Sequence, residues 1–311
     1  MSDDLGGSWA EYECPDVPSN DRCVAALGSG WLVAGDVGLV EIGDSGVRRV
    51  RGRVELQPKG SRERLALHTS ADGRFAGVVV DYGDTGVVVD LSTGLTTLEV
   101  GRGDYCSGVT PFPFGFVGAG EDTAVVAASR WNRLDVYDAG SGRLLTGREF
   151  DDDNELDYFH GALAVSPSGR WVLVDGWVWQ PAAAQVVIDL AAWRAGAVYA
   201  AEADAGVGYP DNWDRPVAWV DNDTVAVQGY GGTRAVEIPS GRVKWTIDGA
   251  EGPLWSDGAL LYAAAPGGLQ VWSTETRERV GVLAGYRPVA RNPATGAFAE
   301  FRDGALRCWR P

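Results

Sequence analysis

The stretch Val87-Val-Val-Asp90-Leu-Ser-Thr-Gly94 is an apolar strand that ends in an acid and runs into a Ser/Thr-Gly turn. Close copies are Leu134-Asp-Val-Tyr-Asp138-Ala-Gly-Ser-Gly142 and Ala235-Val-Glu237-Ile-Pro-Ser-Gly241. With looser copies the pattern occurs seven times, anchored at positions 42, 90, 138, 189, 237, 273 and 310, which are about 45 residues apart on average. A period of this length predicts a repeat architecture.

A second signature precedes each copy, namely a turn between two apolar strands. Thr69–Arg74 stands before Phe75–Val80, and Val165–Arg170 stands before Trp171–Val174. Asp, Asn or Ser combined with Gly provides the backbone conformations of tight hairpin turns. Each repeat therefore contains four strands, which is the unit of a propeller blade. We predict an all-β fold, a single domain over residues 1–311 that forms a seven-bladed β-propeller of four-stranded antiparallel blades.

Ring closure follows from counting strands, because the seventh repeat supplies only three. The segment Ser8–Glu13 alternates between apolar and polar residues as a strand does. Pairing it outside Ala305–Trp309 would complete the blade at 287–310 and cover two exposed strand edges. We therefore expect Cys14 to lie near Cys308.

One segment allows a rival interpretation. Ala182–Ala205 is rich in alanine, which favours a helix. Its β-branched residues Val186–Ile188 and its register with the other third strands favour a strand instead. We predict a strand here.

The chain resembles WD-repeat proteins in several of these motifs. Ser70–Arg74 and Val165–Arg170 resemble the turn between the first and second strands of that family, and Tyr137-Asp138 stands at the position of its Trp-Asp pair. The segment 235–245 is similar to the tryptophan-docking motif of quinoprotein-type propellers. The resemblance covers almost the whole chain and implies a propeller that serves as an interaction scaffold, although a fold alone does not define a function.

Composition excludes several classes of protein. Lys and Arg number 27 against 43 Asp and Glu, so the net charge is −16. This excess of negative charge argues against nucleic-acid binding. No apolar run is long enough for a membrane helix, and the N-terminus lacks the apolar core of a signal peptide. The four cysteines show no zinc-ligand spacing, so we expect reduced thiols in a cytoplasmic protein.

Familiar catalytic motifs are absent from the sequence. There is no GxSxG, P-loop, dinucleotide fingerprint or HExxH, and we assign no catalytic residue, cofactor or metal. The acidic run Asp151–Asp157 does not match a calcium loop, since Leu156 and Ala162 occupy positions that need Gly and an acid. The alternative to a binding protein is a carbohydrate-active or lyase-like enzyme with carboxylates in the central funnel, for which the candidates are Asp81, Asp104, Asp175 and Asp214.

Asymmetry between the two faces indicates where binding occurs. In a closed ring, the links between blades and the turns between second and third strands share one face, which we call the loop face. Long links at 51–64, 101–112, 151–160 and 202–215 lie there, together with most loop aromatics. These aromatics either pack beneath the links or form an accessible platform. The predicted binding residues are Tyr82, Tyr105, Trp131, Trp177, Trp179, Trp213, Tyr230, Asp104, Asp151, Asp153 and Asp214.

The expected partner of this acidic, aromatic face is a protein or peptide with a basic and apolar surface. The stretch Arg48–Arg64 is unusually basic. It is either a solvated edge or a surface for self-association with an acidic loop of another copy.

Overall fold

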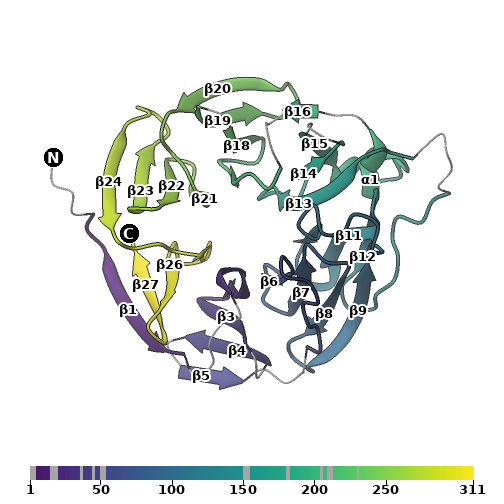
Figure 1. The fold of residues 1–311 in the computed structure, drawn as a ribbon, viewed down its shortest axis with the longest axis horizontal. Helices are drawn as coiled ribbons and strands as arrows, with labels where there is room; N and C mark the ends of the chain where they lie inside the picture. Colours follow the sequence, from purple (N-terminus) through teal and green to yellow (C-terminus); the bar gives the residue numbers. More distant parts are fainter. Residues whose placement is uncertain are drawn as a thin grey trace.

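Seven antiparallel sheets stand in a ring in the computed structural model of the chain (Figure 1). The structure describes residues 5–14, 20–35, 38–43, 46–49, 54–149, 155–179, 183–203, 206–208, 213–229 and 231–311. The predicted seven-bladed β-propeller is confirmed. No helix in the described ranges has the length and hydropathy needed to cross a membrane.

Each blade is numbered in chain order, and its strands run from the inner to the outer edge of the ring (Figure 1). Blade 1 contains β2 (Val24–Leu27), β3 (Gly30–Gly35), β4 (Gly38–Gly43) and β5 (Gly46–Arg49). Blade 2 contains β6 (Arg64–Thr69), β7 (Phe75–Asp81), β8 (Thr85–Asp90) and β9 (Leu95–Gly101). Blade 3 contains β10 (Phe114–Val117), β11 (Ala124–Arg130) and β12 (Arg133–Asp138). Blade 4 contains β13 (Phe159–Val165), β14 (Trp171–Trp177), β15 (Ala183–Asp189) and β16 (Gly206–Gly208). Blade 5 contains β17 (Val217–Trp219), β18 (Thr224–Gly229), β19 (Gly232–Glu237) and β20 (Arg242–Ile247). Blade 6 contains β21 (Leu254–Ser256), β22 (Leu260–Ala265), β23 (Gly268–Ser273) and β24 (Arg279–Ala284). Blade 7 contains β25 (Ala290–Arg291), β26 (Phe298–Arg302), β27 (Ala305–Arg310) and β1 (Ser8–Glu13).

Blade 3 is the least regular. In the described part of the chain its fourth position holds only a single bridge between Tyr137 and Leu144.

Second strands form the core of the ring. Each is paired with a strand on both sides, and its two faces are covered by the neighbouring blades. Every residue of β7 and of β14 is buried, whereas the outer strand β20 is mostly exposed. Close packing between blades explains a glycine in the middle of β7. A Cβ atom on Gly77 would approach the ring of Phe114 in blade 3 to 2.3 Å, so only glycine fits there.

Ring closure occurs as predicted. Strand β1 pairs antiparallel with β27, from Ser8 opposite Arg310 to Glu13 opposite Ala305. Cys14 and Cys308 are buried in the same hydrophobic cluster between blades 7 and 1, and no disulfide joins them. Burial raises the pKa of the Cys308 thiol to about 12, so it stays protonated.

The alanine-rich segment is only partly a strand. Residues 183–189 form β15 as predicted, but the strand prediction is wrong for α1 (Leu190–Arg194). Asp189 caps this helix by accepting the backbone N–H of Ala192 at 2.9 Å, while Leu190 and Trp193 on one side of it are buried. The remaining helical turns are the 3₁₀ helices η1 (Asp21–Cys23), η2 (Gly120–Asp122) and η3 (Ala200–Glu202).

Deleting residues 1–14 is expected to lower stability by several kcal/mol, because it removes β1 and leaves the edge of β27 unpaired. Thermal unfolding and a solubility assay measure the loss. Deletion of residues 1–4 alone is the matched control, since it leaves β1 in place. Equal melting temperatures for the two deletions would contradict this closure.

Candidate functional site

Six aromatic side chains from different links and turns form one cluster on the loop face. We define this aromatic cluster as Tyr105, Trp131, Phe159, Trp177, Trp179 and Trp213. Phe159 stands at its centre, with ring centroids 4.5 Å from Trp131 and 4.6 Å from Trp177. Trp179 and Tyr105 lie 5.3 Å and 5.8 Å from Phe159, and Trp213 lies 5.9 Å from Trp177. The fold thus joins five of the predicted binding residues in a continuous network.

The cluster has a buried base and an accessible top. Phe159 and Trp177 are only 2% and 6% exposed, whereas Tyr105 is 51% and Trp179 is 43% exposed. Both interpretations left open by the sequence therefore apply, each to different members. Phe159 opens strand β13 directly after a long link, and this position is the sequence signal that could have identified it as a member of the site.

Polar contacts fix the indole rings of two members. Trp179 Nε1 donates a hydrogen bond to Asp157 Oδ1 at 2.6 Å, and Trp213 Nε1 donates to the carbonyl of Val109 at 2.7 Å. Trp177 Nε1 is buried and has no hydrogen-bond partner within the described residues. The rings of Trp179 and Trp213 are therefore held by acceptors from separate links.

Tyr82 supports the loop face from below. It is 5% exposed, and its hydroxyl donates to the carboxylate of Asp214. The guanidinium of Arg62 lies 4.1 Å from the centre of the Tyr82 ring, and Arg64 Nη2 lies 4.0 Å from Asp214 Oδ2. Burial and the carboxylate of Asp214 raise the pKa of Tyr82 to about 12. These contacts attach the link between blades 4 and 5 to blade 2.

Backbone strain is concentrated on the same face. Of the six described non-glycine residues with positive φ, four lie here: Tyr82, Cys106, Trp179 and Asp214, with φ between 52° and 61°. Such conformations are unfavourable for residues with a Cβ atom and persist only where surrounding contacts enforce them. Strained positions are typical of binding and catalytic sites.

The remaining predicted site residues are placed as follows. Asp104 is exposed beside Tyr105. Two acids outside the predicted set, Glu155 and Asp157, are exposed near Trp131 and Trp179. Tyr230, Asp151 and Asp153 lie outside the described residues.

Three acceptors at the ends of second strands join consecutive blades. Asp81 Oδ1 accepts the backbone N–H of Phe112 at 3.1 Å, and Asp175 Oδ2 accepts that of Arg215 at 2.8 Å. Gln228 Oε1 accepts that of Gly252 at 3.3 Å. Each donor lies two residues before the first strand of the next blade. We call these contacts the inter-blade hydrogen bonds.

Burial shifts the pKa values of the two carboxylates among these acceptors. Burial raises the pKa of Asp81 despite its contact with Arg22 at 2.8 Å. Burial also raises the pKa of Asp175 to about 6, and the charge of Asp214 adds to the effect. Of the four carboxylates considered for an enzyme, Asp81, Asp175 and Asp214 bind backbone N–H groups, arginines or the Tyr82 hydroxyl, whereas Asp104 is exposed.

Comparison with known proteins bears on the fold. No family model and no curated protein matches the chain. It is similar to a chain of the solved structure titled "Crystal Structure of Mitotic Checkpoint Complex", with a TM-score of 0.63 and 14% identity over 97% of this chain and 91% of that one. It is also similar to the β-propeller domain of Myceliophteria thermophila Cps50 (Swd1), with a TM-score of 0.60 and 14% identity over 97% of this chain and 100% of that domain.

The fold therefore defines a WD-repeat-like seven-bladed β-propeller, as the sequence motifs predicted. At 14% identity the similarity concerns the fold alone.

The raised pKa of Asp175 has a measurable consequence. Its folded pKa of about 6 exceeds the value of about 3.9 in an unfolded chain, so the folded state binds more protons between these values. Stability is therefore lost as pH rises from about 4 to about 6. Asp175→Asn keeps an oxygen for the Arg215 N–H and can pair with a flipped amide of Gln185.

We expect the free energy of unfolding of Asp175→Asn to rise relative to wild type over this pH range, by at most about 3 kcal/mol, and its relative melting temperature to rise with it. Above about pH 6 the difference stays constant. Asp104→Asn, on an exposed carboxylate of the same face, is the control for the general effect of removing one negative charge. If wild type instead becomes more stable relative to Asp175→Asn as pH rises from 4 to 6, the change has the opposite sign and the assignment is wrong.

Proposed function

We propose that this propeller is a non-catalytic interaction scaffold whose loop face binds a protein or peptide with an apolar centre flanked by Arg or Lys. The observation that carries the proposal is the aromatic cluster, in which two exposed rings, Tyr105 and Trp179, stand on a buried aromatic base. Tyr and Trp in such settings contribute a large share of the binding energy at protein interfaces. A rigid base lowers the entropy that is lost on binding.

Charge supports a basic partner. The exposed acids Asp104, Glu155 and Asp157 surround the two accessible rings, and the whole chain carries a net charge of −16. Acidic side chains steer a basic partner to the site, and its Arg or Lys groups can stack on the aromatic faces. Membership of a similar chain in a mitotic checkpoint complex is consistent with a role of this fold in assemblies.

Two other expectations from the sequence bear on this proposal. A cytoplasmic location fits four cysteines that are not joined by disulfides. Self-association through Arg48–Arg64 is not part of the proposed binding mode, because Arg62 and Arg64 already contact Tyr82 and Asp214 within the chain. The side chains of residues 48–53 lie outside the described part.

The test uses fluorescence anisotropy with two sets of labelled short peptides that share an apolar centre. One set carries Arg or Lys on both sides of that centre, and the other carries Asp or Glu. We expect the basic set to bind and its affinity to fall with salt, because surface charges are screened. Trp179→Ala and Tyr105→Ala should each weaken binding by more than about 1 kcal/mol, which is about fivefold.

Leu95→Ala is the matched control, since Leu95 is 67% exposed and apolar but opens β9, directly after the turn between β8 and β9 on the other face. Circular dichroism verifies that each variant folds. Normal binding by both loop-face variants would refute the site. Binding of neither peptide set, combined with a sugar that raises the melting temperature, would favour the carbohydrate-active alternative.

A further inference from the structure

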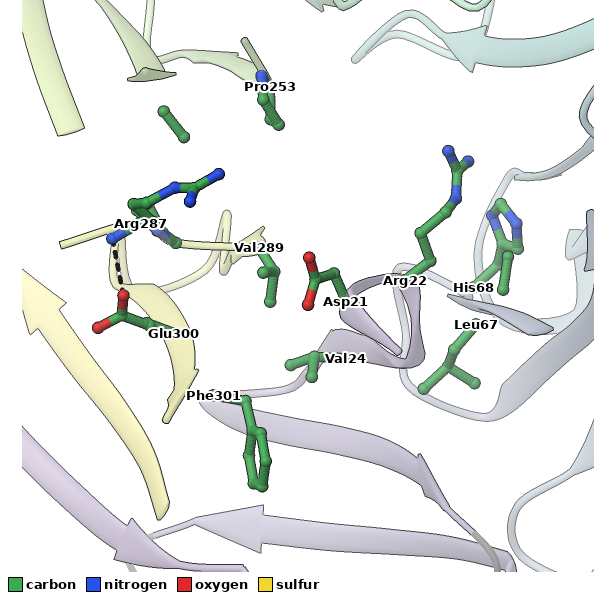
Figure 2. A pocket seen from close by; sticks show the side chains of 13 residues that line it. Asp21, Arg22, Val24, Leu67, His68, Pro253, Arg287, Val289, Glu300 and Phe301 are labelled. Carbon is green, nitrogen blue, oxygen red and sulfur yellow. Dashed lines mark hydrogen bonds between the residues drawn. The ribbon is translucent and has the colours of Figure 1, made fainter. Parts of the chain in front are cut away.

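The centre of the ring contains a cavity that the proposed function does not use. It has a volume of about 510 Å³ and is lined by residues of blades 1, 2, 6 and 7. Figure 2 shows the side chains of Asp21, Arg22 and Arg287 extending into this space. A second cavity of about 950 Å³ shares His68 and Val289 with the first, so these two residues lie between the two halves of the channel.

Two of the four charges that line the smaller cavity are already compensated. Arg22 Nε lies 2.8 Å from Asp81, and Glu300 lies 3.5 Å from Arg307 and accepts the backbone N–H of Arg287 at 2.9 Å. In the described chain, neither the guanidinium of Arg287 nor the carboxylate of Asp21 has an ion-pair or hydrogen-bond partner. The cavity thus presents two solvent-exposed charges that have no partner among the described residues, one positive and one negative, more than 4 Å apart.

Polar and apolar neighbours complete the surroundings. His68 Nε2 is buried without a hydrogen-bond partner among the described residues, which is uncommon in folded proteins and calls for a ligand or water. Burial and the charge of Arg22 lower the pKa of His68 to about 3, so its imidazole is neutral at pH 7. The apolar part of the lining includes Val24, Leu67, Val289 and Phe301 (Figure 2).

We propose that this cavity binds a small zwitterion of the α-amino acid type with an apolar side chain. Its carboxylate would pair with Arg287, its ammonium would pair with Asp21, and its side chain would contact the apolar lining. A simple anion would leave Asp21 unpaired and a simple cation would leave Arg287 unpaired. Only a ligand with both charges can pair with both residues, which favours it over either single ion.

The test compares four probes that share one apolar body: phenylalanine, 3-phenylpropanoate, phenethylamine and 3-phenylpropanol. Isothermal titration calorimetry on the full chain measures their affinities. We expect phenylalanine to bind at least about tenfold more tightly than each of the other three, since a hydrogen bond to a charged group contributes about 1.5–3 kcal/mol. Equal or tighter binding of 3-phenylpropanoate or phenethylamine, or no saturable binding of phenylalanine, would overturn the proposal.

Two variants assign the charges. Arg287→Gln should reduce the affinity for phenylalanine about tenfold and leave the affinity for phenethylamine unchanged. Asp21→Asn should also reduce the affinity for phenylalanine about tenfold, but leave the affinity for 3-phenylpropanoate unchanged. Neither side chain has a partner among the described residues that the substitution would strand, so both variants should fold. Arg279→Gln is the control, because Arg279 is an exposed arginine on the outer strand β24. Loss of binding in Arg279→Gln or full binding in Arg287→Gln contradicts the site.

Histidine NMR provides an independent measurement, because the chain has only two histidines, His68 and His160. Phenylalanine should shift the ring resonances of His68, which lines the cavity, and leave those of the buried His160 in place. A shift of His160 alone would contradict the location. The outcome is independent of the peptide assay, so failure of one proposal leaves the other intact.

Discussion

Antiparallel pairing between β1 and β27 is the interaction on which the rest of the structure depends. A blade can bury its two faces only against its neighbours, so the ring has no stable end until the last blade meets the first. Strand β1 supplies the outer edge of blade 7, and the hydrophobic cluster that contains Cys14 and Cys308 fills the seam with blade 1. Leu5 packs against Gly281 and thereby also attaches the start of the chain to blade 6.

A closed ring brings the links between blades to one face and requires that their backbone groups be satisfied there. The inter-blade hydrogen bonds from Asp81, Asp175 and Gln228 meet part of this requirement. A side-chain hydrogen bond between Asp214 and Tyr82 also attaches the long link between blades 4 and 5 across the face. These attachments hold residues in strained conformations and stack aromatic rings from separate links.

Sequence reasoning predicted the fold well because its signals are local and repeated. Seven copies of one strand and turn pattern reveal the blades, and alternation in Ser8–Glu13 reveals the closing strand. Helix α1 was missed because it lasts little more than one turn. Its signals, a capping Asp189 and the buried pair Leu190 and Trp193, are too short to outweigh the strand pattern around them.

The candidate site was predicted less completely. Its aromatic composition and its face followed from the positions of turns and long links, and the structure joins Tyr105, Trp131, Trp177, Trp179 and Trp213. Which ring is buried and which is exposed did not follow, because Trp177 and Tyr82 are covered by segments from other blades.

The sequence by itself determined the number of blades, their strand pattern, the closing strand and the acidic character of the chain, since each of these resides in neighbouring residues or in totals. Only the tertiary structure decided which carboxylates are buried and which charges meet. Asp21 and Arg287 line one cavity although they stand near opposite ends of the chain. Their proximity arises from closure of the ring, and burial and Coulomb interactions depend on distance in space rather than on separation along the chain.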